Sequence, residues 1–341
     1  MFFNIYYLLI FRKDNINAAV VTFIITTALL FIVNYVPEKS LLLGERLFRG
    51  GGLVQIGIIS IYSGLLSFKM QNRKERSVWR MRSWLLFTIV FYSQLILGIT
   101  ADSLFLLSGK LHLPIPAIIL AGPIFRFSSW FMVILFFSTI LLTGPAWCSQ
   151  LCYFGAVDGY RARKIVGKKR AKLPHNIYKN RNIIKLGFLL IIILVALTLR
   201  LFTAGPGLAT LVGIFAGVLG LFFIVVFSAK WSFMTNCTLY CPIGTIVNKL
   251  KYVSPFRFRI GDSCVKCNAC IEACSYMALT REGIAQNKIG STCTYCGDCI
   301  SSCVHNSFEY HFLGLSPASA EKLWVVLTVI LHSVFLAVAR I

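Results

Sequence analysis

The chain has 341 residues, of which 57% are hydrophobic and only 13% are charged. Charged residues make up about a quarter of a soluble domain, so this composition excludes an ordinary soluble protein and indicates an integral membrane protein. The formal net charge of +22 would favour nucleic-acid binding in a soluble protein. Here the basic residues lie beside long apolar stretches, where they orient helices and contact anionic lipid. We therefore expect membrane lipid, and no nucleic acid, as a partner.

Seven apolar stretches are long enough to span a bilayer. A transmembrane helix needs roughly 20 predominantly apolar residues, and suitable stretches lie at 18–36, 51–68, 83–100, 130–147, 186–202, 208–227 and 323–339. The opening MFFNIYYLLIF is too short to span, and it has neither the basic start nor the cleavage site of a signal peptide. We interpret it as an interfacial segment, and the fold class as an α-helical multi-span membrane protein.

Basic residues are distributed unequally between the two predicted faces of the membrane. If the first span runs from inside to outside, 27 of the 34 Lys and Arg residues fall on the inner face. Short cytoplasmic loops collect Lys and Arg. We therefore expect a multi-pass protein of the cell (inner) membrane, in which the segment between the sixth and seventh spans lies in the cytoplasm.

The loop between the third and fourth spans, residues 102–126, is unusually apolar and contains Pro114, Pro116 and Pro123. Irregular backbone persists at membrane depth only where protein covers it or water reaches it. The loop is therefore a candidate re-entrant or interfacial segment near a quinone site. No polar constellation stands out in it beyond Asp102 and His112, so ordinary loop packing is the alternative to a quinone role.

Four cysteines form two pairs with the same spacing. Cys148 and Cys152 lie in CSQLCYFGAV, and Cys237 and Cys241 lie in CTLYCPIGTI, so the two copies form a weak internal repeat. If a helix continues through a pair, the two Cβ atoms are about 5 to 6 Å apart. That separation is too wide for an easy disulfide, which needs about 3.5 to 4.5 Å. Each pair follows an even-numbered span, so both should emerge on the cytoplasmic side.

These four thiols have several candidate roles. Four thiolates are the usual complement of an iron–sulfur centre, thiolates also bind soft metals such as Cu(I) or zinc, and two pairs can form a redox-active dithiol. Buried cysteines can also lack any ligand, but chance would not repeat the spacing together with Gly155 and Gly244. Binding of a third iron–sulfur centre or of a soft metal is therefore the favoured interpretation.

The other eight cysteines lie in two runs, CVKCNACIEAC from Cys264 and CTYCGDCISSC from Cys293. Each run has the spacing of bacterial ferredoxins with two 4Fe-4S clusters, in which the fourth cysteine of one run binds the other cluster. Zinc modules instead separate two Cys-x2-Cys halves by a longer loop, so structural zinc is disfavoured. The predicted ligand sets are Cys264, Cys267, Cys270 and Cys303 for one cluster, and Cys293, Cys296, Cys299 and Cys274 for the other.

A membrane hairpin array with two Cys-x3-Cys motifs and a double ferredoxin motif resembles the membrane polyferredoxins. That family includes the quinol dehydrogenase subunit of periplasmic nitrate reductase systems (NapH type), the nitrous oxide reductase accessory flavoprotein (NosR type) and the copper-reducing oxidase assembly protein (CcoG type). The family's short motif typically reads Trp-Cys-x3-Cys-Pro; here Trp147 precedes the first pair and Pro242 follows the second. The family commonly has proline after the fourth ferredoxin cysteine, where this chain has Ser275 and Val304. The resemblance covers about residues 83–304 and implies quinol as a redox substrate.

Composition and motifs divide the chain into a transmembrane hairpin array (1–258), an inserted α+β ferredoxin domain with two 4Fe-4S clusters (259–312) and a C-terminal transmembrane helix (313–341). We expect a membrane-anchored electron-transfer protein, a subunit of a quinol dehydrogenase-like complex, that relays electrons between the ferredoxin domain and quinone or a partner redox protein. The alternative is a metal-handling assembly factor that uses cluster electrons to reduce copper or another metal at the membrane cysteines. The sequence shows no nucleophile triad and no nucleotide-binding glycine loop, so no catalytic side chain is predicted.

Overall fold

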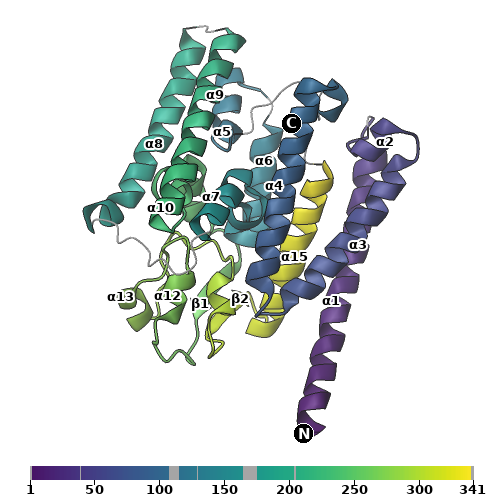
Figure 1. Cartoon of the computed structure of the whole chain (residues 1–341), viewed down its shortest axis with the longest axis vertical. Helices are drawn as coiled ribbons and strands as arrows, with labels where there is room; N and C mark the ends of the chain where they lie inside the picture. Colours follow the sequence, from purple (N-terminus) through teal and green to yellow (C-terminus); the bar gives the residue numbers. More distant parts are fainter. Residues whose placement is uncertain are drawn as a thin grey trace. The chain divides into compact units, whose positions relative to one another are not determined.

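The structure, a computed structural model, describes residues 2–38, 40–106, 115–128, 130–163, 175–202 and 205–338. The chain divides into two compact units, whose elements are labelled in Figure 1. Unit 1 comprises Met1–Leu111 with Tyr310–Ile341, and unit 2 comprises His112–Glu309. The boundaries predicted from the sequence separate stretches of different composition, whereas these units follow packing. Packing groups the later helices of the hairpin array with the cysteine-rich segment.

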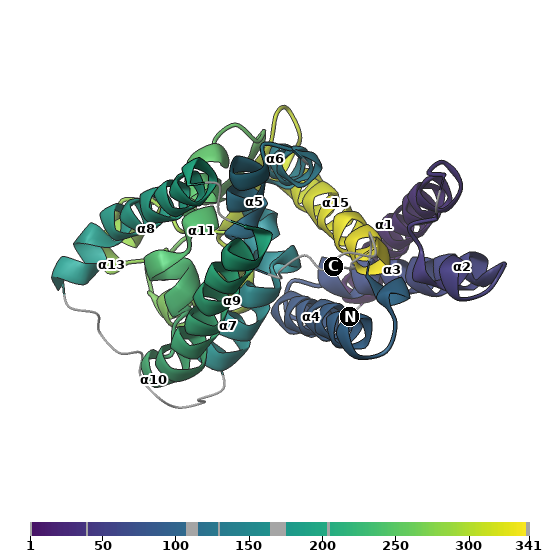
Figure 2. The ribbon, with the colours of Figure 1, turned by 90° about the horizontal axis from the view of Figure 1, so that it is seen from above.

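Unit 1 consists of helices that form on the long apolar runs. It contains α1 (Phe2–Tyr35), α2 (Leu43–Leu47), α3 (Gly51–Gln71), α4 (Arg76–Thr100), the short η1 (Ser103–Phe105) and α15 (Pro317–Val338). Helix α3 packs against α1, α4 and α15, as Figure 2 shows for α1 and α15. A small apolar cluster of Leu30, Leu42, Ile56 and Ala337 joins these helices. The opening residues, expected as a separate interfacial segment, continue into α1 without a break.

Polar side chains also lie inside unit 1. His332 on α15 is buried, and its Nε2 atom lies 3.1 Å from the Tyr62 hydroxyl on α3. Near the start of α15, buried Glu321 forms ion pairs with Arg73 and Arg76, and the Arg76 Nη2 atom lies 2.6 Å from Glu321 Oε1. These contacts tie α15 to elements that precede it by about 250 residues in the chain.

The helical part of unit 2 is interrupted twice at the cysteine pairs. It contains α5 (Ile118–Arg126), α6 (Phe131–Thr143), η2 (Gly144–Ala146), η3 (Trp147–Leu151), α7 (Tyr153–Arg163), α8 (His175–Leu201), α9 (Pro206–Phe223), η4 (Ile224–Ser228), α10 (Ala229–Trp231), η5 (Asn236–Tyr240) and α11 (Pro242–Leu250). Of these, η3, η4 and η5 are single π-helical turns. Helix α8 packs against α5, α11 and η5.

The cysteine-rich segment has little regular structure. It contains β1 (Phe256–Ile260), α12 (Ala269–Ala273), α13 (Arg281–Ala285), α14 (Asp298–Ser301) and β2 (Phe308–Phe312), and the two strands pair in one sheet. The Phe258 and Phe308 rings stack with centroids 5.5 Å apart. The segment thus consists of short helices and one strand pair joined by loops, and the inserted ferredoxin domain with two clusters stays a prediction.

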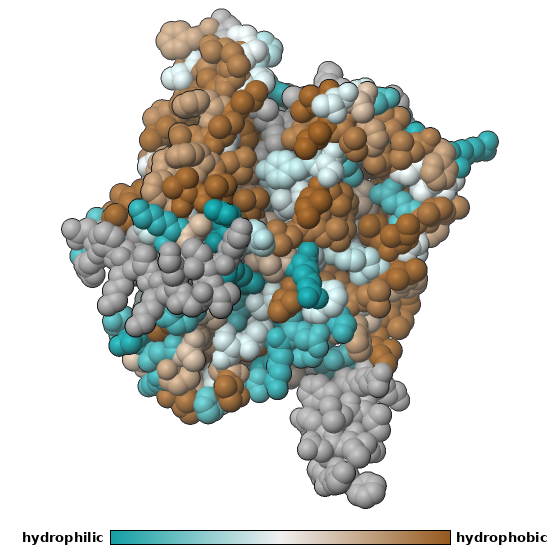
Figure 3. Space-filling view, in the orientation of Figure 1, coloured by the Kyte–Doolittle hydropathy of each residue, from teal (hydrophilic) through white to brown (hydrophobic). Residues whose placement is uncertain are grey.

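Seven helices in the described ranges are long and apolar enough to cross a membrane, and each overlaps one predicted stretch. They are Asn15–Tyr35, Gly51–Gln71, Arg76–Thr100, Met132–Leu151, Ile177–Leu201, Pro206–Trp231 and Pro317–Val338. Apolar side chains cover these helices (Figure 3); on α9, for example, Leu211 and Phe215 are exposed. Large apolar surfaces of this kind are stable in lipid. Each predicted stretch therefore forms a helix of membrane-crossing length, although the helix bounds differ from the predicted ones by up to nine residues, and the seven helices indicate a membrane protein.

The apolar loop after the third span is partly helical. Residues 118–126 form α5, which contains Pro123 and packs against α8. The Asp102 carboxylate accepts a hydrogen bond from the Leu104 backbone N–H at 2.8 Å and caps η1. His112 lies outside the described residues. The quinone role considered for this loop therefore stays a prediction.

We predict that Glu321→Gln destabilises unit 1 by about 3 to 5 kcal/mol, because it leaves the buried Arg76 guanidinium without its counter-ion. Glu75→Gln, which weakens the exposed pair with Lys69, should cost no more than about 1 kcal/mol. Thermal unfolding of the detergent-solubilised variants measures both effects. Equal losses of stability in the two variants would contradict the prediction.

Candidate functional site

All twelve cysteines of the chain lie among the described residues of unit 2, and no disulfide joins any of them. They come from the ends of spanning helices and from the cysteine-rich segment. Cysteines in regularly spaced groups of this kind are typical of metal or cluster binding.

The first pair lies where the fourth spanning helix ends. Cys148 lies in the π-helical turn η3, and the backbone N–H of Cys152 donates to the Trp147 carbonyl at 3.0 Å. Cys152 itself is extended, with φ −76° and ψ 111°, and α7 begins at the next residue. The backbone N–H of Gly155 points at the Cys152 sulfur, 3.4 Å away. The start of α7 thus offers a hydrogen-bond donor to a thiolate.

The second pair repeats this geometry. Cys237 lies in the π-helical turn η5, and the backbone N–H of Cys241 donates to the Asn236 carbonyl at 2.9 Å. Cys241 is extended, and the backbone N–H of Gly244 lies 3.3 Å from its sulfur. Neither pair therefore continues a regular α-helix. Single π-turns are rare and occur mostly at functional sites.

The two pairs converge on one region. The thiol of Cys148 interacts electrostatically with those of Cys241 and Cys152, and Cys237 interacts with the other three thiols. Burial raises the pKa of the Cys152 thiol to about 12. Cys148, Cys152 and Cys241 are buried and Cys237 is half-buried, and buried thiols are stable as thiolates only if a metal core replaces their protons. The donor set therefore fits a four-thiolate centre.

Two charged side chains at this region were not singled out from the sequence. Asp158 on α7 is fully buried, accepts a hydrogen bond from the backbone N–H of Cys237 at 3.1 Å and another from the Ser228 hydroxyl, and burial raises its pKa to about 7. Lys185 on α8 is 1% exposed and interacts electrostatically with the thiols. In the sequence, Lys185 lies just before the predicted span 186–202, among the basic residues of the predicted inner face. Only the burial of Lys185 distinguishes it from those other basic residues.

The eight ferredoxin-type cysteines line two separate cavities. Cys274, Cys293, Cys296 and Cys299 line one cavity, together with apolar residues such as Phe258 and Leu279. Cys264, Cys267, Cys270 and Cys303 line the other. The structure thus brings together the two ligand sets derived from the spacing, including the exchanged fourth cysteine of each run. We call them the proximal set (Cys274, Cys293, Cys296, Cys299) and the distal set (Cys264, Cys267, Cys270, Cys303).

Single-ion sites and clusters place their ligand sulfurs differently. Within the described ranges, no three Cys, His, Asp or Glu side chains are close enough to hold one metal ion. Zinc holds four sulfur atoms at about 2.3 Å from one centre. In a 4Fe-4S cluster each thiolate binds a different iron, so the ligand sulfurs stand further apart.

The two Cys-x3-Cys pairs, Cys148 with Cys152 and Cys237 with Cys241, are called the membrane pairs or membrane cysteines below. The proximal set is held directly against the first of them. The Tyr276 hydroxyl, two residues after Cys274, donates to the Cys148 carbonyl at 3.0 Å, and the Ser149 hydroxyl donates to the Thr294 carbonyl at 3.2 Å. Lys251 Nζ donates to the Ser291 and Cys293 carbonyls at 2.7 and 3.1 Å. An ion pair between Arg163 on α7 and Asp298 on α14 adds a further link.

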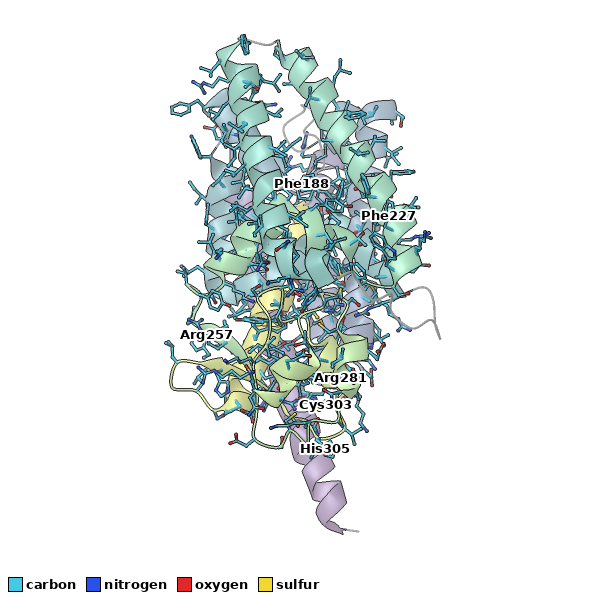
Figure 4. All side chains as sticks on the ribbon, turned by 90° about the vertical axis from the view of Figure 1, so that its left-hand side faces the viewer. Phe188, Phe227, Arg257, Arg281, Cys303 and His305 are labelled. Atoms are coloured by element: carbon cyan, nitrogen blue, oxygen red, sulfur yellow. The ribbon has the colours of Figure 1, made fainter. Side chains whose placement is uncertain are left out.

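The distal set lies at the end of unit 2 that is far from helices α8 and α9. In Figure 4, Cys303 and the nearby His305 lie far from Phe188 and Phe227, which mark α8 and η4. Cys267 is exposed, and Val304 next to Cys303 is 89% exposed. The distal set therefore faces the surroundings, whereas the proximal set faces the membrane pairs.

Residues 125–172 match the family model of a 4Fe-4S binding domain. This range contains Cys148 and Cys152 but none of the ferredoxin-type cysteines. No curated protein and no solved structure matches the chain. The family match and the seven membrane-length helices together support a membrane protein that binds at least one 4Fe-4S cluster.

We predict that Tyr276→Phe destabilises unit 2 by about 1 to 2 kcal/mol, because it removes a buried hydrogen bond to the Cys148 carbonyl. Tyr160→Phe on α7 is the matched control, since the Tyr160 side chain is exposed and its loss should change stability by less than about 0.5 kcal/mol. Unfolding of both variants in detergent tests this. No difference between them would show that the Tyr276 contact adds nothing to stability.

Proposed function

We propose that this protein is a membrane-anchored iron–sulfur electron relay with three 4Fe-4S centres. The distal and proximal sets would each hold one cluster, and Cys148, Cys152, Cys237 and Cys241 would hold the third. Two observations support the third centre: the family match that covers the first pair, and the electrostatic interaction of Cys237 with the other three thiols.

The direct contact between the proximal set and the first membrane pair carries this proposal. Tyr276 bonds to the backbone of Cys148 itself, so no other element of unit 2 intervenes along that connection. Electron tunnelling weakens steeply with distance, and contact of this kind keeps two centres close. The order of the relay is then distal set, proximal set, membrane cysteines.

Each 4Fe-4S centre would supply one-electron chemistry when it is bound, and the protein holds the centres in order and shields two of them from water. The exposed distal set is where a soluble redox partner would exchange electrons. The membrane cysteines would exchange electrons with quinone or with a membrane partner subunit. We propose the cytoplasmic side of the inner membrane for the cysteine-rich segment, since basic residues are concentrated on that face.

A quinol dehydrogenase-like role within an oxidoreductase complex follows from the resemblance to membrane polyferredoxins. The alternative, a metal-handling factor that reduces copper at the membrane cysteines, requires those thiols to gather around one ion. The match of residues 125–172 to a 4Fe-4S binding domain favours the relay. The metal content of the protein separates the two functions.

We predict about twelve iron atoms per chain in anaerobically purified protein, and about eight in the Cys148→Ser variant, because each centre holds four. Cys267→Ser, in the exposed distal set, should also retain about eight but lose a different EPR signal. Cys148→Ser should leave both ferredoxin-type signals intact and stop electron transfer to quinone analogues.

About eight iron atoms in the wild-type protein, with copper or zinc bound at the membrane cysteines, would refute the third centre and favour the metal-handling function. Unchanged quinone reduction in Cys148→Ser would remove the membrane cysteines from the electron path.

A further inference from the structure

A lysine that is buried in a membrane-length helix keeps its charge only if negative charge lies beside it. Lys185 lies within the spanning helix Ile177–Leu201 and is 1% exposed. Moving an ammonium ion out of water costs several kcal/mol unless an anion compensates it. In the described residues, no carboxylate forms an ion pair with Lys185.

The groups that act on Lys185 with opposite charge are thiols. Cys241, Cys237 and Cys148 interact with it most strongly, and its positively charged neighbours are Arg181, one helical turn earlier, and Lys251, which also interacts with Cys148. Neutral thiols cannot compensate an ammonium ion. Cluster-bound thiolates can, because a four-thiolate 4Fe-4S centre is a dianion when oxidised and a trianion when reduced.

The backbone beside the membrane cysteines leaves room for this ammonium group. A Cβ atom added at Gly244 would lie 3.3 Å from Lys185 Nζ. The backbone N–H of Gly244 lies 3.3 Å from the Cys241 sulfur. Lys185 Nζ and the Gly244 N–H therefore approach the same side of the second pair, where both can stabilise negative charge on sulfur.

Lys251 shows how a lysine with a docking role differs from Lys185. Lys251 Nζ is held by two carbonyl groups of the cysteine-rich segment, those of Ser291 and Cys293. It therefore fixes the segment in place. Lys185 has no hydrogen bond of this kind within the described ranges, and its neighbours of opposite charge are the membrane thiols.

We propose that Lys185 is the counter-ion of the centre at the four membrane cysteines and sets its reduction potential, an inference that rests on the proposed third centre. A fixed positive charge stabilises the reduced centre more than the oxidised one, because the reduced centre is more negative. It therefore raises the reduction potential of this centre. In the relay, a single electron would pass from the centre held by the proximal set to the centre held by the membrane cysteines, with no bond or proton exchanged. Lys185 makes that step more favourable.

The test is an EPR redox titration of the purified protein with its clusters bound. In Lys185→Gln we expect the equilibrium constant for electron transfer from the proximal set to the membrane centre to fall by about tenfold, a decrease of about 59 mV for one electron. The potentials of the two ferredoxin-type clusters should not change. Lys185→Arg, which keeps the charge, should restore the wild-type potential.

The matched control is Lys179→Gln, on the same helix but exposed, which should leave all three potentials unchanged. If Lys185→Gln loses the third centre while Lys185→Arg retains it, the counter-ion role is supported. Loss of the centre in both variants would show a packing role and overturn the proposal. About twelve iron atoms with an unchanged potential in Lys185→Gln would also overturn it and leave the relay intact. About eight iron atoms in the wild type would instead refute the third centre itself.

Discussion

The convergence of four thiols in a water-free region is the constraint on which the structure of unit 2 depends. Cys148, Cys152 and Cys241 are buried, and they come from two chain segments about 90 residues apart. Buried thiolates are stable only beside positive charge and hydrogen-bond donors. The surrounding structure supplies both, through Lys185 and through the N–H groups at the starts of α7 and α11.

The π-helical turns explain how both pairs meet this constraint with the same short motif. A regular α-helix would stack the two cysteines of a pair along one face. The π-turn widens the helix at the first cysteine and ends it at the second, which is extended. The next helix then starts with its N–H groups near the second sulfur. A weak repeat in the sequence thus becomes a clear repeat in backbone geometry.

Contacts with the region around the four thiols also fix the position of the cysteine-rich segment. Its proximal set touches the first membrane pair through Tyr276, and Lys251 and Arg163 fix its loops and its short helix α14. In the distal set Cys267 is exposed, and so is Val304, the residue after Cys303. One side of the segment therefore faces the membrane cysteines, and the other is open to a partner. This polarity is what an electron relay between a soluble protein and a membrane site requires.

The sequence alone determined the spans, because twenty consecutive apolar residues have few stable alternatives to a membrane helix. It also predicted the two ferredoxin-type sets, because the spacing of cysteines limits which thiols reach one cluster. Tertiary structure decided the rest. Lys185, Lys251 and Asp158 look like ordinary loop or helix-end charges, and only packing reveals that they are buried. The contact of Tyr276 with Cys148 and the order of the cysteine sets join segments that are far apart in the chain. Three-dimensional packing, and not local spacing, decides where such segments meet and where the π-turns form.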